Sequence, residues 1–372
     1  MTNGEPPVSL EPLGWDSSWS VVFEQRRRPG ADVRPGRVGR VDRGRCVVLT
    51  DEGPVQATLG GGVLERMAED GSQAPCTGDW CVLRAWPDGP VTIEDVLPRR
   101  TAVVRADVGG SSRGQVLAAN LDVVGLVVGL VPEPSVARVE RLVALAWASG
   151  AHPVVILTKS DLVTDAEQIA DDVAVAVAGA TVLVCSVVTG EGMDAVRALV
   201  DPNMTVGLLG SSGAGKSSLV NALAGAPVLV TREIREDGRG RHTSVRRELV
   251  ALPGGGAVVD TPGLRGIGLV DADEGLSATF ADIDALAARC RFKDCSHTVE
   301  PGCGVLEAVN TGELPVRRLE SWRKLQREMA WMKARTDARL RAERAKEWKQ
   351  RSKASRRGRR PAGGPERGRP DR

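Results

Sequence analysis

The chain has 372 residues, of which 42% are hydrophobic and 26% charged, with a formal net charge of +2 at pH 7. This length suits two or three domains, and the balanced composition excludes a disordered or fibrous chain in favour of a soluble globular protein. The sequence contains no long apolar segment, and Met1 to Pro7 lacks the charged start and apolar core of an export signal. We therefore expect a cytoplasmic protein that makes no membrane contact.

The near-neutral total hides an uneven distribution of charge along the chain. From Arg317 to Arg372 the sequence holds 21 basic and 7 acidic residues, which leaves the preceding part acidic overall. Residues 342–372 are rich in Arg and Lys together with Gly and Pro. We expect a disordered basic arm that is attracted to phosphates, with a merely solubilising tail as the alternative.

The first segment, residues 1–33, is rich in Pro, Gly and charge, and we expect it to be only partly ordered. It contains one isolated apolar patch that could dock locally on the rest of the protein. The patch consists of Leu13, Trp15, Trp19, Val21, Val22 and Phe23.

Residues 34–100 alternate short runs of Val, Leu and Ile with turn clusters, which predicts five strands and a small barrel of the OB type. The runs are Arg37 to Val41, Arg45 to Thr50, Val55 to Leu59, Asp79 to Trp86 and Val91 to Val96. OB barrels commonly stack bases on aromatic side chains, and here only Trp80 and Trp86 are available. We favour backbone contact with a nucleic acid over base recognition, and a barrel without any ligand is the alternative. The residues for this contact are Arg37, Arg40, Arg43 and Arg45.

From residue 101 to about 280 the pattern is that of an α/β domain. Leu121 to Val131 is almost wholly apolar, and Val154 to Leu157 and Thr181 to Val184 are short apolar runs typical of buried strands. Helical patterns lie between and after these runs, at Val136 to Ala148, Ala166 to Ala178 and Met193 to Val200. This alternation predicts a parallel sheet with helices on both faces, which binds ligands at the carboxyl ends of its strands.

A phosphate-binding loop occupies residues 210–218. It follows the apolar run Val206 to Leu209 and fits the pattern G-x-x-x-x-G-K-[ST] at Gly210, Gly215, Lys216 and Ser217. Its backbone N–H groups would surround the phosphates, with Lys216 neutralising the outer ones and Ser217 holding Mg²⁺. A flexible glycine-rich linker is the alternative. The predicted phosphate contacts are Gly210, Ser211, Ser212, Gly213, Ala214, Gly215, Lys216, Ser217 and Ser218.

Two earlier loops have the composition of a guanine site. The first is Thr158, Lys159, Ser160 and Asp161, and the second, Cys185 to Gly190, contains Ser186. The Asp161 carboxylate can accept hydrogen bonds from both N1–H and the amino group of guanine, and adenine offers no such pair of donors. Binding adenine would leave a buried carboxylate unpaired, so we expect GTP and GDP as ligands. Each loop alone also fits an ordinary surface loop.

Two further segments follow the phosphate loop. Thr231 to Arg247 has the composition of a mobile loop and contains His242 and Thr243; the strand Ala257 to Val259 leads into Asp260-Thr261-Pro262-Gly263. In this D-x-x-G pattern, Asp260 can reach Mg²⁺ through water and the Gly263 N–H can sense the γ-phosphate. The next residue is Leu264 rather than the Gln that orients water in many small GTPases, so unassisted hydrolysis should be slow.

The order of these motifs is permuted. Both base loops precede the phosphate loop, whereas in ordinary GTPases they come last. The same sheet can form if the old termini are joined and a new break is opened elsewhere, because chain termini are often close in space. The chain then runs from the γ-phosphate-sensing loop directly into the C-terminal module, residues 281–341.

This module carries Cys290, Cys295, His297 and Cys303 in the spacing C-x₄-C-x-H-x₅-C. Four such ligands match a closed tetrahedral site for one structural Zn²⁺, with unligated thiols as the alternative. A following helical pattern gives one apolar face, which we expect to pack against the module. Its members are Val316, Leu319, Trp322, Leu325, Met329 and Met332.

Taken together, these motifs resemble the bacterial ribosome small-subunit-dependent GTPase A family. The resemblance rests on the base loops before the phosphate loop, Gly240 to Thr243, Asp260 to Gly263, Cys290 to His297 and Glu300 to Cys303. Leu97 to Arg100 and Ala118 to Asp122 also resemble that family's join between barrel and GTPase domain. It covers about residues 13–335 and implies an OB barrel, a permuted GTPase domain and a zinc module.

The resemblance also implies a function. The family binds the maturing 30S subunit and its 16S rRNA late in assembly and hydrolyses GTP to GDP and phosphate with stimulation by that subunit. We expect a monomer that leaves after hydrolysis. The rival hypotheses are an RNA-binding assembly scaffold that uses nucleotide only as a switch, and a P-loop ATPase.

Two positions depart from the family pattern. Thr158 replaces the usual Asn, which removes an amide that helps tie the base loop to the phosphate loop, so guanine selectivity should survive with weaker affinity. Ser244 follows Thr243 where the family often has Thr, and we favour Thr243 as the Mg²⁺ ligand. The resemblance favours His242 as the residue that positions the attacking water; contact with RNA is the alternative.

Overall fold

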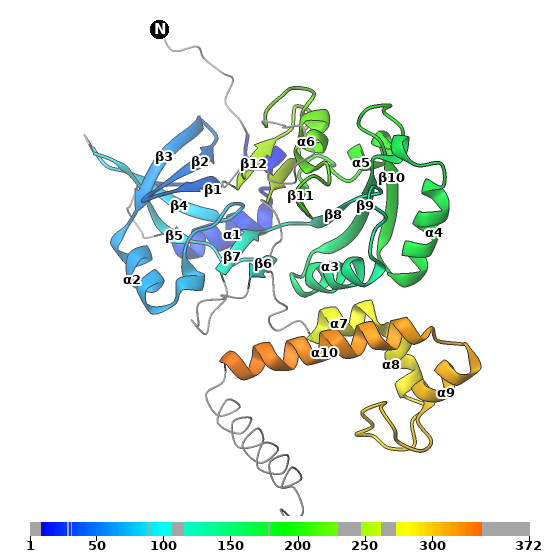
Figure 1. Cartoon of the computed structure of the whole chain (residues 1–372). Helices are drawn as coiled ribbons and strands as arrows, with labels where there is room; N and C mark the ends of the chain where they lie inside the picture. The colour runs from blue at the N-terminus through cyan, green and yellow to red at the C-terminus, as the bar shows by residue number, and fades with distance from the viewer. Residues whose placement is uncertain are drawn as a thin grey trace, which may run out of the picture.

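The computed structural model describes residues 9–27, 30, 32–87, 89–105, 115–177, 179–229, 247–261 and 273–336. His242, Thr243, Gly263, Leu264 and the basic arm lie outside these residues. In Figure 1 the barrel lies to the left of the central sheet, and the yellow and orange C-terminal helices lie below both. Among the described residues, no helix is both long enough and apolar enough to cross a membrane.

The N-terminal barrel has the five predicted strands. They are β1 (Val33–Asp42), β2 (Arg45–Thr50), β3 (Gly53–Leu59), β4 (Trp80–Ala85) and β5 (Val91–Val96). Their order is β1-β2-β3-β5-β4, and β4 pairs back to β1, which closes the barrel. The fully buried side chains of Val38, Val48, Leu83 and Ile93 belong to its core. The short helix α2 (Gly61–Glu69) and the turn η2 (Gly71–Gln73) connect β3 to β4.

The apolar patch near the N-terminus docks on the barrel as predicted, except for Val21, which is 57% exposed. After the turn η1 (Glu11–Leu13), helix α1 (Ser17–Arg26) begins where the Asp16 carboxylate accepts a hydrogen bond from the Trp19 N–H at 2.8 Å. Trp19 and Phe23 are buried, and the ring of Trp15 lies 4.8 Å from that of Trp80 in an edge-on arrangement. The aromatic cluster therefore covers one end of the barrel.

The central sheet is that of the predicted α/β domain. Its strands are β8 (Val123–Gly129), β9 (His152–Thr158), β10 (Thr181–Cys185), β11 (Thr205–Gly210), β12 (Glu248–Ala251) and β13 (Ala257–Asp260). The order is β10-β9-β8-β11-β13-β12, and all neighbours are parallel except β12 and β13. Its helices are α3 (Val136–Ala148), α4 (Ala166–Ala176), α5 (Met193–Arg197) and α6 (Lys216–Ala224), with the turn η3 (Ser160–Leu162) after β9.

Two features of this domain were not predicted from the sequence. The antiparallel pair β6 (Ala102–Arg105) and β7 (Gln115–Ala119) forms a separate small sheet between the barrel and β8. Strand β12 pairs with β13 and also, through Arg40 opposite Glu248, with β1 of the barrel. Barrel and central sheet are thus hydrogen-bonded into one continuous sheet. The helix predicted at Met193 to Val200 ends earlier, at Arg197.

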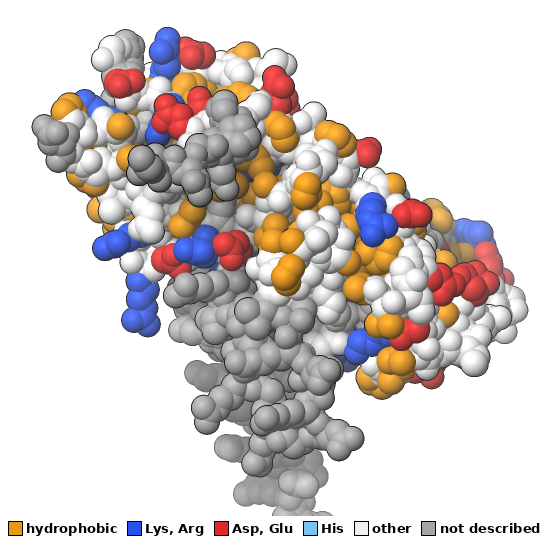
Figure 2. All heavy atoms as spheres, turned by 90° about the horizontal axis from the view of Figure 1, so that it is seen from above, with side chains coloured by type: hydrophobic (Ala, Val, Ile, Leu, Met, Phe, Trp, Pro, Cys, Tyr) orange, Lys and Arg blue, Asp and Glu red, His pale blue; other side chains and the backbone are white. Residues whose placement is uncertain are grey.

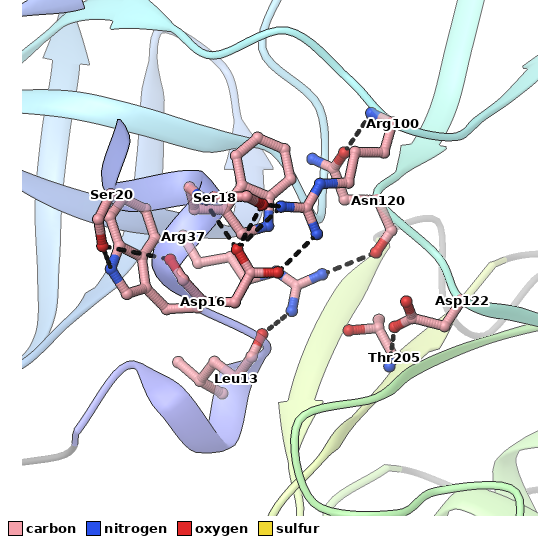
Figure 3. A network of polar contacts seen from close by, with 11 residues as sticks. Leu13, Asp16, Ser18, Ser20, Arg37, Arg100, Asn120, Asp122 and Thr205 are labelled. Atoms are coloured by element: carbon pink, nitrogen blue, oxygen red, sulfur yellow. Dashed lines mark hydrogen bonds and ion pairs between the residues drawn. The ribbon is translucent and has the colours of Figure 1, made fainter. Parts of the chain in front are cut away.

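Arg37 corrects one prediction about the barrel. Its side chain is only 1% exposed and donates to the carbonyl oxygens of Leu13 and Asn120, as Figure 3 shows, and to that of Gly78. Trp80 is equally buried. Neither side chain can contact a nucleic acid, because both are buried where the barrel packs against α1 and the central domain. Arg40 is partly exposed but paired with Asp42 and Glu248.

The C-terminal module consists of α7 (Asp273–Thr279), α8 (Ala281–Ala287), α9 (Gly304–Thr311) and α10 (Val316–Thr336). Helix α7 lies against α3 so closely that a Cβ on Gly275 would come within 2.3 Å of the Ala144 carbonyl oxygen. Leu319, Leu325 and Met329 of the predicted apolar face of α10 are buried, but Val316 is 59% exposed. The side chain of Met332 lies outside the described part.

Candidate nucleotide site and metal centre

The predicted nucleotide-binding loops meet at one edge of the central sheet. The phosphate loop follows β11, the first base loop follows β9, the second follows β10, and Asp260 ends β13. These four strands are parallel, so their carboxyl ends lie at the same edge. The arrangement is the one that the permuted motif order requires, because β11 lies between the earlier strand β8 and the later strand β13.

Glycines give the phosphate loop its shape. Gly213 and Gly215 have φ values of +82° and +95°, a region that other residues rarely adopt. A Cβ on Gly210 would lie 2.2 Å from the Val127 carbonyl oxygen, so only glycine lets β11 approach β8 so closely here. Gly215 is also the residue before α6, whose N-terminus adds partial positive charge to the loop.

Within this site the charges of Lys216 and Asp260 influence each other's pKa. The Lys216 ammonium donates to the carbonyl oxygens of Gly210 and Ser211, both at 3.0 Å. Burial lowers the pKa of Lys216, which the Asp260 charge partly restores; burial raises the pKa of Asp260, against the effects of Lys216 and the Ser217 hydroxyl. Among the described residues, no group donates to Asp260 Oδ1, although this atom is buried. A metal-bound water would satisfy this oxygen.

The first base loop is tied to the phosphate loop through Thr158. Its Oγ1 donates to the Ala214 carbonyl oxygen at 2.6 Å, and the side chain is 2% exposed. Lys159 follows in the left-handed region at φ +66°, where the backbone turns sharply away from β9. From the sequence we expected that replacing the usual asparagine would remove a hydrogen bond between the base loop and the phosphate loop. In the structure the Thr158 hydroxyl makes such a bond instead.

The two base loops contact each other through Ser186 and Asp161. The fully buried Ser186 Oγ donates to Asp161 Oδ1 at 2.6 Å and accepts from the N–H groups of Val188 and Thr189 at 3.1 and 3.2 Å. This hydroxyl holds the exposed carboxylate in one orientation. The structure therefore brings together the predicted base, phosphate and Asp260 residues, whereas His242, Thr243 and Gly263 lie outside the described ranges.

The second site is the Cys₃His cluster of the C-terminal module. The ligand atoms of Cys290, Cys295, His297 and Cys303 all lie within 4.8 Å of one another. The Cys290 and Cys303 sulfurs are 3.8 Å apart, and His297 Nδ1 lies 3.5 and 3.4 Å from them. A zinc tetrahedron with Zn–S near 2.3 Å and Zn–N near 2.0 Å has an S–S edge of about 3.8 Å and an S–N edge of about 3.5 Å. These residues fit a tetrahedral Zn²⁺.

Contacts around the cluster hold its ligands in place. Cys303 precedes α9, and its sulfur accepts the Leu306 N–H at 3.4 Å, as a thiolate at a helix N-terminus would. Arg323 of α10 donates to the His297 carbonyl oxygen, and the Trp322 ring lies 5.6 Å from the imidazole. The Glu300 carboxylate accepts hydrogen bonds from the Ser296 hydroxyl and from several N–H groups of its own loop, including Thr298 N–H at 2.8 Å, and these bonds keep the pKa of Glu300 low.

Comparisons with known proteins place this geometry in context. A family model described as RsgA GTPase matches residues 96–270. A protein of Streptomyces avermitilis named small ribosomal subunit biogenesis GTPase RsgA is 49% identical over 344 residues, covering 91% of this chain and 91% of that protein. A protein of the same name from Opitutus terrae is 42% identical over 354 residues and covers 92% of this chain and 95% of its own length.

Solved structures agree with the fold. The crystal structure of YjeQ from Thermotoga maritima has a TM-score of 0.58 at 25% identity and covers 79% of this chain and 97% of its own. YloQ, described as a circularly permuted GTPase, has a TM-score of 0.56 at 23% identity and covers 82% of this chain and 97% of its own. The YloQ likeness supports the permuted fold alone.

Proposed function

This chain belongs to the RsgA family of GTP hydrolases, and we propose that it acts in the biogenesis of the small ribosomal subunit by binding the 30S particle. The proposal rests mainly on one observation: the base loops, the phosphate loop and Asp260 lie together at one edge of the central sheet. The chain also aligns with its named relatives over about nine-tenths of both lengths. We keep the cytoplasmic location, the monomeric state and the domain boundaries given above as parts of this proposal.

In this proposal GTP is bound by residues 158–161, 186, 210–218, 260 and 263. Asp161 selects guanine, Lys216 neutralises the outer phosphates, and Ser217 with Thr243 holds Mg²⁺. Asp260 Oδ1 is buried and has no hydrogen-bond partner within the described part of the chain, which supports a water bound to that ion. One Zn²⁺ at the Cys₃His cluster stabilises the C-terminal module, and no chemical step passes through it.

Replacing one carboxylate oxygen of Asp161 by an amino group, in Asp161→Asn, tests whether the protein binds guanine nucleotides. In Asp161→Asn the side chain keeps an oxygen for N1–H but gains an N–H₂ that opposes the guanine amino group. Xanthine carries an oxygen at that position, so the variant should prefer xanthosine diphosphate while the unchanged protein prefers GDP. The site discriminates by leaving the wrong partner's groups unpaired, so the exchange should shift the preference by at least about tenfold. Equal binding of ADP by the unchanged protein would support the ATPase hypothesis instead.

His242 is proposed to position the attacking water once the subunit orders its loop. Replacing His242 by Ala should then reduce subunit-stimulated turnover while leaving binding to the subunit intact. Undiminished stimulation would remove His242 from the chemistry and leave the alternative, contact with RNA.

The attraction to 16S rRNA is assigned chiefly to basic side chains outside the barrel joint. Figure 2 shows, on the face at the top of Figure 1, acidic and basic side chains beside one another rather than one extended field of either sign. The sequence concentrates its positive charge after Arg317. Removing residues 342–372 should therefore weaken subunit binding and reduce its dependence on salt.

A further inference from the structure

The barrel presents one tryptophan to solvent. Trp86 is 41% exposed, whereas Trp80, the other tryptophan between the start of β1 and the end of β5, is almost fully buried. Trp86 directly follows β4 and begins the loop that leads to β5. The loop between the fourth and fifth strands is one of the two loops with which OB barrels bind oligonucleotides. The exposed indole therefore lies at a position where a barrel of this type contacts a nucleic acid strand.

Contacts with both flanking strands hold the Trp86 ring in one orientation. The Arg84 guanidinium, on the same face of the barrel two positions earlier, lies over the ring at 3.7 Å from its centroid. The Trp86 Nε1–H donates to Thr92 Oγ1 at 2.9 Å, and the Thr92 hydroxyl donates to Glu94 Oε1 at 2.5 Å. Thr92 itself pairs with Arg84 across β4 and β5. The ring is thus fixed on one face and at its nitrogen edge.

This arrangement leaves the opposite face of the indole as the chief exposed surface. A flat partner can stack on that face without having to order the Trp86 side chain, so the entropic cost of binding falls mainly on the partner. Stacking of a base on an aromatic side chain strengthens binding roughly 5- to 150-fold per base and accepts every base, because each base has a π face. The partly exposed Arg84 adds a positive charge beside the ring.

A single exposed apolar side chain is common on soluble proteins and needs no partner. Leu64 of α2 is such a residue, at 48% exposed on the same barrel. Trp86 differs from Leu64 because a cation covers one face of its ring and a chain of hydrogen bonds fixes its polar edge. These contacts give a rigid aromatic surface of defined orientation.

We propose that Trp86 is a stacking platform for an unpaired base of RNA, with Arg84 and Thr92 as the residues that position its ring. The inference rests on the proposed function, since 16S rRNA is the RNA that this function brings to the barrel. It adds a base contact to the backbone contact expected from the sequence, and this contact is blind to the identity of the base.

The test compares binding of the full chain to two fluorescent RNAs of about ten nucleotides, one single-stranded with its bases and one an abasic backbone of the same length and charge. The unchanged protein should bind the base-bearing RNA at least about fivefold more tightly. Trp86→Leu should lose this preference and keep its affinity for the abasic RNA. Trp86→Phe keeps a ring and should retain most of the preference. The salt dependence should stay the same in Trp86→Leu, because no phosphate contact is removed.

Leu64→Ala is the matched control and should leave the preference unchanged. The inference would be overturned by an unchanged protein without preference, by a preference that survives in Trp86→Leu, or by an equal loss in Leu64→Ala. Weaker binding of Trp86→Leu to 30S subunits with the preference for base-bearing RNA intact would indicate a protein partner and would also overturn it. The proposed function is judged separately: it fails if the unchanged protein does not bind 30S subunits, whatever its preference between the two RNAs.

Discussion

Two buried arginines join the flanking parts of the molecule to its central domain, and they do so with different partners. Arg37, at the barrel joint, donates to three backbone carbonyl oxygens, of which Figure 3 shows those of Leu13 and Asn120. Arg318, at the C-terminal joint, donates to the carboxylates of Glu140 and Asp282, at 2.8 to 3.0 Å, and to two carbonyl oxygens. The acceptors of Arg37 are all neutral, whereas Arg318 belongs to an ion cluster.

The difference appears in the two pKa values. Burial lowers the pKa of Arg37 to about 10, because the charges of Asp122 and Asp79 compensate only in part. Burial also acts to lower the pKa of Arg318, but the hydrogen bonds that Arg318 donates to Asp282 and Glu140 raise it above its ordinary value. Glu140 is fully buried, and its carboxylate accepts hydrogen bonds from Arg318 at 2.8 Å and from the Ser321 hydroxyl, so that removing Arg318 leaves a buried carboxylate without its closest cation. The C-terminal joint is therefore the one that fails when a single partner is removed.

Removing the proposed zinc should have the largest effect, confined to the C-terminal side. Structural zinc contributes on the order of 10 kcal/mol in small zinc-dependent modules, where metal binding and folding are coupled. We expect a strong chelator to abolish hydrogen-exchange protection around Cys303 and α9 while β1 to β5 of the barrel stay protected. Equal loss of protection in the barrel would contradict the expectation that the effect of zinc removal is confined to the C-terminal side.

Arg318→Met should destabilise the protein by about 3–5 kcal/mol, because it removes the closest cation from the buried Glu140 carboxylate and leaves it only the Ser321 hydroxyl and the more distant Arg317. Chemical denaturation measures the change. Arg317→Met is the matched control, since Arg317 is half-exposed and its nearest nitrogen lies 3.8 Å from Glu140 Oε1. The double variant Arg318→Met with Glu140→Leu should recover part of the loss. Equal effects of the Arg317 and Arg318 changes would refute the ion-cluster interpretation.

Arg37→Met should cost less, about 1–3 kcal/mol. The Leu13 and Asn120 carbonyl oxygens lose a donor, but Gly78 keeps the Asn120 side-chain amide at 3.1 Å, and the cost of burying a charge disappears. Denaturation compared with Arg43→Met, a change at an exposed barrel position, measures the effect. A loss larger than that of Arg318→Met would reverse the comparison.

Asp16→Asn should show the smallest effect, below about 1 kcal/mol, because the Asp16 pair with Arg100 is half-exposed and screened. The hydrogen bond from Arg100 lowers the pKa of Asp16 below its usual 3.8. A lowered folded-state pKa stabilises the protein above pH 3.8, and this contribution is lost as the pH falls further. The Tm difference between Asp16→Asn and the unchanged protein should therefore shrink as the pH falls below about 3.8. A difference that grows on acidification would contradict this sign.

Much of the fold was predictable because its signals are local. Alternating apolar runs marked the five barrel strands, and glycine spacing with Lys216 marked the phosphate loop. Strand β12 was missed, because four residues beginning with Glu248 carry no strand pattern of their own and are extended through pairing with β13 and β1.

Side chains whose partners are distant in sequence were the harder part. Arg37 was interpreted as facing RNA, yet its carbonyl partners Leu13 and Asn120 lie 24 and 83 positions away. The pair of Glu140 and Arg318 spans 178 positions, and each residue alone has the character of a solvated helix surface. The Thr158 hydroxyl bond spans 56. Only the folded chain brings such partners together.

The most direct test of the proposed function is GTP turnover by the full chain with and without purified 30S subunits, with Lys216→Ala as the control. We predict slow hydrolysis alone, because Leu264 cannot orient water, and at least about tenfold stimulation by 30S, absent in Lys216→Ala. Turnover that 30S leaves unchanged, or that survives in Lys216→Ala, would contradict the proposal.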